Sequence, residues 1–139
     1  MYDGQRPRRI FPKKQILIYP ALNNCYTEDS PFESVKTNGT GYLLTAEKME
    51  DYLKLYESCP EDRRNPYFAP ILEKDLRNMP DTLILTAEFD PLRDEGEAFG
   101  EKLKEAGKSC GKCTGSQVRF TGILHWESNF CMCRRALHM

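Results

Sequence analysis

The sequence predicts an α/β fold built around parallel β-strands. Two short apolar runs carry this prediction, residues 15–22 (QILIYPAL) and residues 82–89 (TLILTAEF). Both have the continuous apolar character of strands that are buried on both faces, as strands of parallel sheets usually are. A helical pattern follows the second run, and the two together make half of a βαβ unit.

The helix after the second run is expected at residues 94–106, with apolar residues on one stripe. Asp94 and Glu97 stand in capping-box spacing at its start, and Gly107 is a typical C-terminal stop. These signals predict both ends of the helix.

A second helix is expected between the two strands. Residues 45–58 place apolar and aromatic side chains at helical spacing behind Thr45, a residue type that favours the N-cap position. The flanking residues 30–41 and 59–70 are rich in proline, glycine, asparagine and charge, which indicates loops. The region between the strands therefore reads as an insertion.

Composition and charge exclude several classes of protein. The chain has 139 residues, 40% of them apolar, and a formal net charge of −1, which fits one modest core and excludes a polycation built for nucleic acid. The longest mainly apolar stretch, residues 16–22, is far shorter than the roughly 20 residues of a membrane helix. Residues 1–9 have no apolar region of the kind found in secretory signals. We therefore expect a cytoplasmic protein with no nucleic-acid and no membrane partner.

The most specific segment is TAEFDPLRDEG, residues 86–96. It places Asp90 just after the carboxyl end of the second strand, where open α/β sheets carry their chemistry. Pro91 favours an extended backbone at Asp90, which would direct the carboxylate over the sheet edge. From spacing alone the alternative is that Asp90 only caps a turn, because aspartate before proline is common in loops.

Residues 12–107 resemble the α/β-hydrolase family, in its hormone-sensitive-lipase-like branch of carboxylesterases. The similar segments are ILIYPAL, GYLLT, NPYFAP and ILTAEFDPLRDEGEAFGEKLKEAG. The resemblance implies a fragment of the α/β-hydrolase fold with two late parallel strands, part of the cap and one flanking helix. It also implies that Asp90 is the acid of a Ser-Asp-His triad, which would orient the catalytic histidine. Tyr52 and Tyr56 fall in a helix similar to the cap that shapes the acyl pocket, so a small acyl ester is the expected substrate of the complete protein.

The serine that the resemblance implies is not found at its place. In the family it stands in a G-x-S-x-G elbow ahead of the strand that corresponds to residues 15–22, and this chain begins after that point. A formal match occurs at residues 107–111, but it follows a helix and comes after Asp90, so Ser109 is not the expected nucleophile. We therefore expect the chain to be inactive alone.

A shifted reading frame explains why the histidine loop of the family is not found in this sequence. His125 follows Asp90 at a suitable distance, but the residues after it depart from the family pattern. Codons permitted from Phe120 onward can be read in another frame as HGYFALGIKFLHVQESF, which is similar to the family's histidine loop and final helix. Residues 4–12 can likewise be read one base later as ARDRGEFF. We therefore expect His125 to have no catalytic role.

The predicted organisation follows from these frames. Residues 1–11 and residues 108–139 are predicted to be out-of-frame tails, and residues 12–107 a partial α/β-hydrolase domain with a cap-side insertion at about 23–70. The charge distribution agrees, because residues 108–139 and the first 14 residues each carry five basic and one acidic side chain, whereas the middle of the chain is acidic.

The rival function rests on the cysteine-rich tail. Its candidate metal donors are Cys110, Cys113, Cys131, Cys133, His125 and His138. Zinc sites favour cysteine pairs separated by two to four residues, and the second pair here has only one intervening residue. A non-enzymatic thiol or metal-binding module is therefore the alternative to an ester-hydrolase fragment. We assign no residue as a metal ligand and expect no cofactor.

Overall fold

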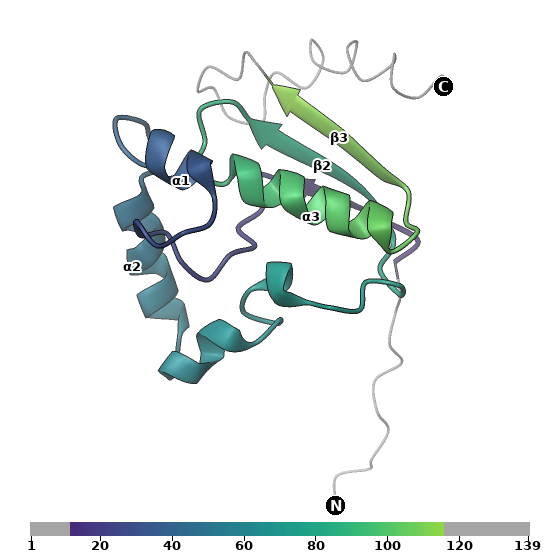
Figure 1. Ribbon diagram of the computed structural model, residues 1–139, viewed down its shortest axis with the longest axis horizontal. Helices are drawn as coiled ribbons and strands as arrows, with labels where there is room; N and C mark the ends of the chain where they lie inside the picture. Colours follow the sequence, from purple (N-terminus) through teal and green to yellow (C-terminus); the bar gives the residue numbers. More distant parts are fainter. Residues whose placement is uncertain (1–11, 116–139) are drawn as a thin grey trace, which may run out of the picture.

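A computed structural model describes residues 12–115 of the chain. Three strands form one parallel sheet: β1 (Lys14–Ile18), β2 (Asp81–Ala87) and β3 (Cys110–Gly115). The strand order is β1-β2-β3, so β2 is central. Figure 1 shows the sheet behind helix α3 (Arg93–Glu105), which follows β2 in the sequence. The predicted α/β class with parallel strands is confirmed.

The third strand is not among the predicted elements. Its sequence, CGKCTG, has no apolar run, and glycine weakens strands. It pairs with β2 in parallel register, from Thr82 opposite Cys110 to Ala87 opposite Gly115. This pairing satisfies backbone groups that β2 would otherwise leave open. The sheet therefore continues past residue 107, the predicted limit of the domain.

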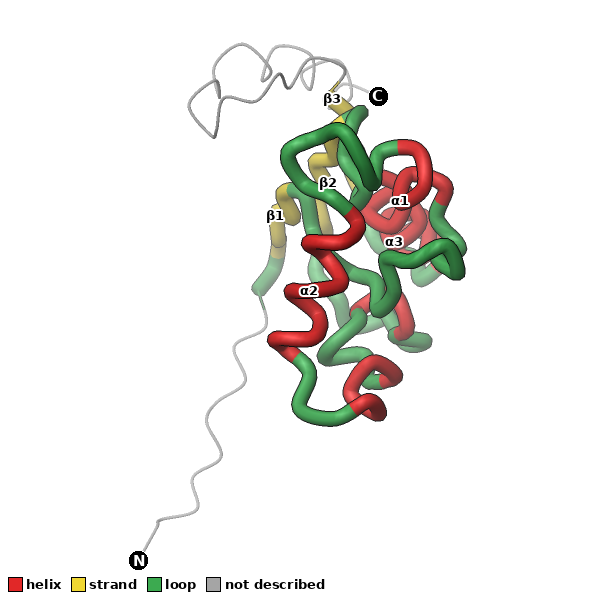
Figure 2. Tube along the Cα trace, turned by 90° about the vertical axis from the view of Figure 1, so that its left-hand side faces the viewer, coloured by secondary structure: helices red, strands yellow, loops and turns green. Residues whose placement is uncertain are grey.

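β1 differs from its prediction in burial. Exposed and half-buried residues alternate along it, and Ile16 and Ile18 are 55% and 47% exposed. The other face packs inward, with Leu17 against the core cluster that contains Ile84. Figure 2 shows α1 and α3 on one side of the three strands. The prediction of burial on both faces is wrong for β1, because no element between residues 12 and 115 covers the second face.

Helix α3 lies close against β2. Phe99 and Leu103 are buried in the core cluster beneath it. A Cβ added at Gly96 would lie 2.9 Å from the Thr86 Cγ2 atom, so the small residue permits this close approach. The helix stops as predicted at Gly107, whose φ of 77° is the left-handed conformation that glycine adopts readily.

The start of α3 does not follow the predicted capping box. The N-cap residue is Leu92, and no side chain caps the helix. The carboxylate of Asp94 instead accepts hydrogen bonds from Ser34 N at 2.7 Å and from Arg93 Nε at 2.8 Å. The capping prediction is wrong because a partner distant in sequence, invisible to local spacing, occupies this carboxylate.

The region between β1 and β2 holds helices α1 (Glu33–Thr37) and α2 (Ala46–Tyr56) and the 3-10 helices η1 (Pro60–Arg64) and η2 (Pro70–Leu72). Thr45 caps α2 as predicted, because its Oγ1 accepts a hydrogen bond from Lys48 N at 3.2 Å. None of the helices between residues 12 and 115 has the length and apolar composition that a bilayer crossing requires. A second core cluster lies under α1 and α2, made of Tyr26, Val35, Met49, Leu53 and Leu92.

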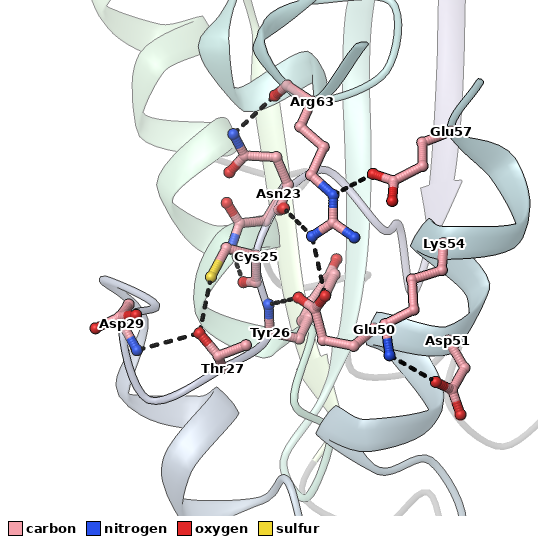
Figure 3. A network of polar contacts seen from close by, with 11 residues as sticks. Asn23, Cys25, Tyr26, Thr27, Asp29, Glu50, Asp51, Lys54, Glu57 and Arg63 are labelled. Carbon is pink, nitrogen blue, oxygen red and sulfur yellow. Dashed lines mark hydrogen bonds and ion pairs between the residues drawn. The ribbon is translucent and has the colours of Figure 1, made fainter. Parts of the chain in front are cut away.

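One arginine joins the segment after β1 to α2 and η1. The guanidinium of Arg63 donates to Glu57 and, at 2.9 Å, to Glu50 Oε2, as Figure 3 shows. It also donates to the Asn24 carbonyl at 3.3 Å, and the Asn24 side chain donates back to the Arg63 carbonyl at 2.8 Å. The hydrogen bonds to Glu57 and Glu50 raise the pKa of Arg63. These paired charges fix α2 relative to the segment that leaves β1.

The open face of β1 leads to a prediction about self-association. Replacing Ile16 and Ile18 together by serine should reduce concentration-dependent association, because both apolar side chains are exposed on a strand whose outer edge pairs with no strand of residues 12–115. Sedimentation velocity over a range of concentrations measures the effect. The free energy of unfolding should change by less than roughly 1 kcal/mol.

Leu17→Ser is the matched control, since Leu17 belongs to the same strand but packs on the covered face. This change should cost roughly 2 kcal/mol or more by creating a cavity. Unchanged association of the double variant would contradict the interpretation of this face.

Candidate active site

Asp90 lies where the sequence predicted, in the turn between the carboxyl end of β2 and helix α3. Its Oδ1 accepts a hydrogen bond from Leu92 N at 2.9 Å, which is the turn-capping contact that spacing alone suggested. No donor to Oδ2 is found within residues 12–115. Burial raises the pKa of Asp90, and the Leu92 amide offsets part of this rise. One carboxylate oxygen is thus fixed by the turn, and the geometry permits the other to accept a further hydrogen bond.

Tyr19 approaches Asp90 from the neighbouring strand. It follows β1 directly, and its N–H donates to the Leu85 carbonyl of β2 at 2.9 Å. Its pKa is raised first by partial burial and then by the negative charge of Asp90. Its φ of 48° is unusual for a residue other than glycine and costs about 1–3 kcal/mol, a strain that often marks functional sites. Tyr19 is not among the residues predicted for the site, although its place at the end of a strand was a usable signal.

Two further aromatic side chains stand beside this edge of the sheet. Phe89, the residue before Asp90, stacks on Tyr42 with ring centroids 5.4 Å apart and an interplanar angle of 22°. Both are partly exposed. The loop next to Asp90 in sequence therefore carries a partly exposed aromatic pair.

The formal G-x-S-x-G match lies at the opposite end of the strands from Asp90, beside the start of β2. The Ser109 carbonyl accepts a hydrogen bond from Thr82 N at 3.0 Å, and Ser109 N donates to Asp81 Oδ1 at 3.3 Å, both at the start of β2. Because β2 has seven residues, roughly 20 Å separate its two ends. Ser109 also lies in a turn from helix to strand, whereas a nucleophile elbow leads from strand to helix. Ser109 is therefore not part of a site with Asp90.

Glu95 is the buried carboxyl nearest to the site in sequence. It is fully buried, and its Oε1 accepts hydrogen bonds from Leu22 N at 2.7 Å, Asn23 N at 3.3 Å and Tyr26 Oη at 2.8 Å. Its Oε2 is buried without a hydrogen-bonding partner among the described residues. Burial raises its pKa to about 7, against the opposing effect of the three donors.

Glu95 is likewise not among the predicted site residues. The usable signal was its position on the buried stripe of α3, four residues before Phe99 and eight before Leu103. An acidic residue at such a position needs buried partners. Glu95 finds them in the segment that leaves β1, so it links that segment to the helix that follows Asp90.

Only some of the candidate metal donors lie within the described residues. No group of three histidine, cysteine or acidic side chains that could hold a metal ion occurs in the described part of the chain. Cys110 packs against the core cluster under α3. His125, His138, Cys131 and Cys133 lie outside the described residues, as do most of the residues in the two predicted out-of-frame tails.

The fold and the position of Asp90 define an open α/β protein with a carboxylate at the carboxyl edge of a parallel sheet. The chain belongs to the α/β-hydrolase fold family, whose model matches residues 2–118. This match extends past both predicted limits of the domain, residues 12 and 107. The predicted family and fold class are confirmed.

Several of the relatives that the chain matches are named as ester hydrolases. The chain is 38% identical over 96 residues to the ethyl acetate hydrolase of Pseudomonas putida, a match that covers 69% of this chain and 29% of that protein. It is 40% identical over 80 residues to the arylesterase of Saccharolobus solfataricus, covering 57% of this chain and 26% of the relative. This chain thus spans less than a third of either protein.

Solved structures show the same relationship. The esterase of the archaeon Pyrobaculum calidifontis is 43% identical, with a TM-score of 0.66 over 74% of this chain and 33% of that chain. Carboxyl esterase 2 of the fungus Tuber melanosporum is 31% identical, with a TM-score of 0.68 over 76% of this chain and 34% of that chain.

The raised pKa of Glu95 predicts how stability depends on pH. From the ordinary value of 4.5 up to about 7, the folded chain holds a proton at Glu95 that the unfolded chain has released. The stability that this proton supports is therefore complete below pH 4.5 and is lost as the pH rises to about 7. The loss is on the order of 3 kcal/mol. Urea unfolding at several pH values measures it.

Glu95→Gln is the control for this measurement. Its amide oxygen can still accept from the three donors of Oε1, but it does not titrate. The difference between the two proteins isolates Glu95 from Asp90, whose pKa is raised in the same direction. A constant difference in unfolding free energy between pH 4.5 and 7 would show that Glu95 keeps an ordinary pKa.

Proposed function

We propose that this chain is part of a carboxylic-ester hydrolase in which Asp90 is the acid of a Ser-Asp-His triad. The observation that carries the proposal is the half-buried Asp90 carboxylate at the carboxyl end of β2, with only one oxygen held by the turn. The ester-hydrolase names of the relatives support the same reaction class.

The chemistry that Asp90 would supply follows from this geometry. In a triad the acid accepts a hydrogen bond from one imidazole nitrogen, which sets the tautomer and the ring orientation and stabilises the imidazolium that forms. The bond from Leu92 N keeps the carboxylate from rotating. Asp90 is therefore suited to orienting a base, and it would not attack the ester itself.

The proposed substrate is a small acyl ester. Tyr52 and Tyr56 lie on α2, the helix similar to the cap that shapes the acyl pocket, and are exposed there, where a further part of the complete protein could cover them. Phe89, which precedes Asp90 in the chain, stacks on Tyr42 and adds aromatic surface to this region. A cytoplasmic location without nucleic-acid or membrane partners also belongs to the proposal.

The domain limits are proposed from the reading-frame argument. The segments 1–11 and 108–139 would be out-of-frame products, with the partial hydrolase domain at 12–107. β3 pairs with β2 inside the second segment, so any frame change there has to leave backbone pairing possible. The encoding DNA across both junctions tests this assignment.

We predict that the purified chain does not hydrolyse short acyl esters. It would hold only the acid, and Ser109 lies at the wrong edge of the sheet to act with it. Release of a chromogenic alcohol from an acetyl ester measures the activity. Ester turnover that disappears in Ser109→Ala would refute this prediction.

The role of Asp90 is testable in a chimera. Residues 12–107 of this chain replace the matching segment of the Pseudomonas putida ethyl acetate hydrolase, and hydrolysis of ethyl acetate is followed. Asp90→Asn should lower kcat by about 10⁴-fold if the effect known from serine proteases transfers, because the imidazole would adopt the wrong tautomer.

Glu88→Gln in the same chimera is the matched control, since it changes a carboxylate in the same turn. It should leave kcat within about 3-fold of the parent, as expected for a surface substitution. Near-normal activity of the Asp90→Asn chimera would rule out the assignment of the acid.

A further inference from the structure

The turn that carries Asp90, residues 88–91, is held from outside the sheet. We call it the acid turn. Among residues 12–115, pairing of β2 ends at Ala87, opposite Gly115, and no strand in this range pairs with the acid turn. Three of its carbonyl oxygens accept hydrogen bonds from side chains instead. Asn38 Nδ2 donates to the Glu88 carbonyl at 3.1 Å and to the Asp90 carbonyl at 3.3 Å. Ser34 Oγ donates to the Pro91 carbonyl at 2.8 Å.

Two contacts within the β2–α3 connection complete the arrangement. The Glu88 carbonyl also accepts from Arg93 Nη1 at 3.0 Å, and the Asp90 carbonyl accepts from Arg93 N at 3.1 Å. These contacts are local in sequence. Ser34 and Asn38, in contrast, belong to the segment between β1 and β2, and the acid-turn residues that they bind come 50 to 57 residues later in the sequence.

Ser34 and Asn38 present one polar face to the acid turn. They are four residues apart, at α1 and at its C-cap, so they lie on the same side of the helix. Both are buried, at 0% and 6% exposure, and buried polar side chains need hydrogen-bonding partners. They find these partners in the carbonyl groups of the acid turn.

The contact between α1 and α3 is reciprocal. Ser34 N donates to Asp94 Oδ2 at 2.7 Å, and Asp94 N donates to Ser34 Oγ at 3.1 Å. The five-residue α1 is too short to be stable alone, so its position depends on such contacts and on Val35 in the second core cluster. α1 and the acid turn therefore hold each other in place.

We propose that Ser34 and Asn38 are positioning residues for Asp90. They lie in the segment between β1 and β2, so the position of that segment sets the position of the carboxylate. The inference rests on the proposed function, which gives Asp90 the part of the triad acid. Catalytic groups need placement within fractions of an ångström, and a displacement of about 1 Å can cost about 10²-fold in rate.

Two substitutions in the full 139-residue chain test the inference without any need for activity. Asn38→Asp puts a carboxylate oxygen where the amide donates to two carbonyl groups, and Ser34→Ala removes the hydroxyl that joins Pro91 to Asp94. Asn38→Ser serves as a milder variant if the aspartate variant does not fold. Ser34→Thr retains the hydroxyl and is the conservative rescue.

Thr37→Val is the matched control. Thr37 lies on the same helix, but its exposed hydroxyl donates to the Glu33 carbonyl within α1 and does not contact the acid turn. Two readouts report on the acid turn itself. They are the hydrogen-exchange rate of the Leu92 amide, which Asp90 binds, and the pKa of the Asp90 carboxyl by NMR titration.

We expect Ser34→Ala and Asn38→Asp, or Asn38→Ser in its place, to raise exchange at Leu92 at least about 10-fold relative to the β2 amides. In Ser34→Ala and Asn38→Ser the pKa of Asp90 should fall toward its ordinary value, since burial is the main cause of its rise. Asn38→Asp is judged by exchange alone, because its added carboxylate would itself raise the pKa of Asp90. Ser34→Thr and Thr37→Val should behave like the parent. An unchanged Asp90 pKa together with unchanged exchange at Leu92 would overturn the inference. A uniform rise in exchange that includes the β2 amides would also overturn it, because Ser34 and Asn38 would then serve stability alone.

The chimera supplies the functional measurement. Ser34→Ala should lower kcat by about 10²-fold while KM stays within about 2-fold, because the carboxylate is displaced without loss of substrate contacts. An unchanged kcat would overturn the positioning role. If Asp90→Asn is silent in the chimera, the proposed function fails, whereas exchange and titration still decide whether α1 holds the acid turn.

Discussion

The parallel pairing of β2 with strands on both of its sides sets the positions of the other elements. Parallel strands send all their carboxyl ends to one edge, so Tyr19 after β1 and Asp90 after β2 approach each other. The same rule places Ser109, which precedes β3, at the other edge. Pairing direction alone thus separates the residues that can share a site from one that cannot.

Buried polar side chains connect the long excursion between β1 and β2 to the sheet. Glu95 accepts three hydrogen bonds from the segment that leaves β1, while Ser34 and Asn38 donate to the acid turn. Such groups are costly to bury unless they are paired, so each connection is specific in direction and distance. The excursion is therefore attached to the strand ends that carry the candidate site, as well as to its own apolar core.

The two faces of the sheet differ in a way that fits the partial match to the relatives. α3 covers one face, and Ile16 and Ile18 leave the second face apolar and exposed. Parallel sheets are normally covered on both faces. No element of residues 12–115 covers this face or the outer edge of β1, and the chain spans less than a third of the length of the relatives that it matches.

The sequence by itself determined the elements whose signals are local. The β1 and β2 runs, the Thr45 cap, the Gly107 stop and the place of Asp90 after a strand follow from apolar runs, helical spacing and turn chemistry. Tertiary structure decided the rest. β3 forms through pairing with β2 although CGKCTG has no strand pattern, and the partners of Asp94, Glu95 and Asn38 lie about 50 to 73 residues away in the chain. Hydrogen bonds between such distant groups depend on how the elements pack, and no local pattern encodes that packing.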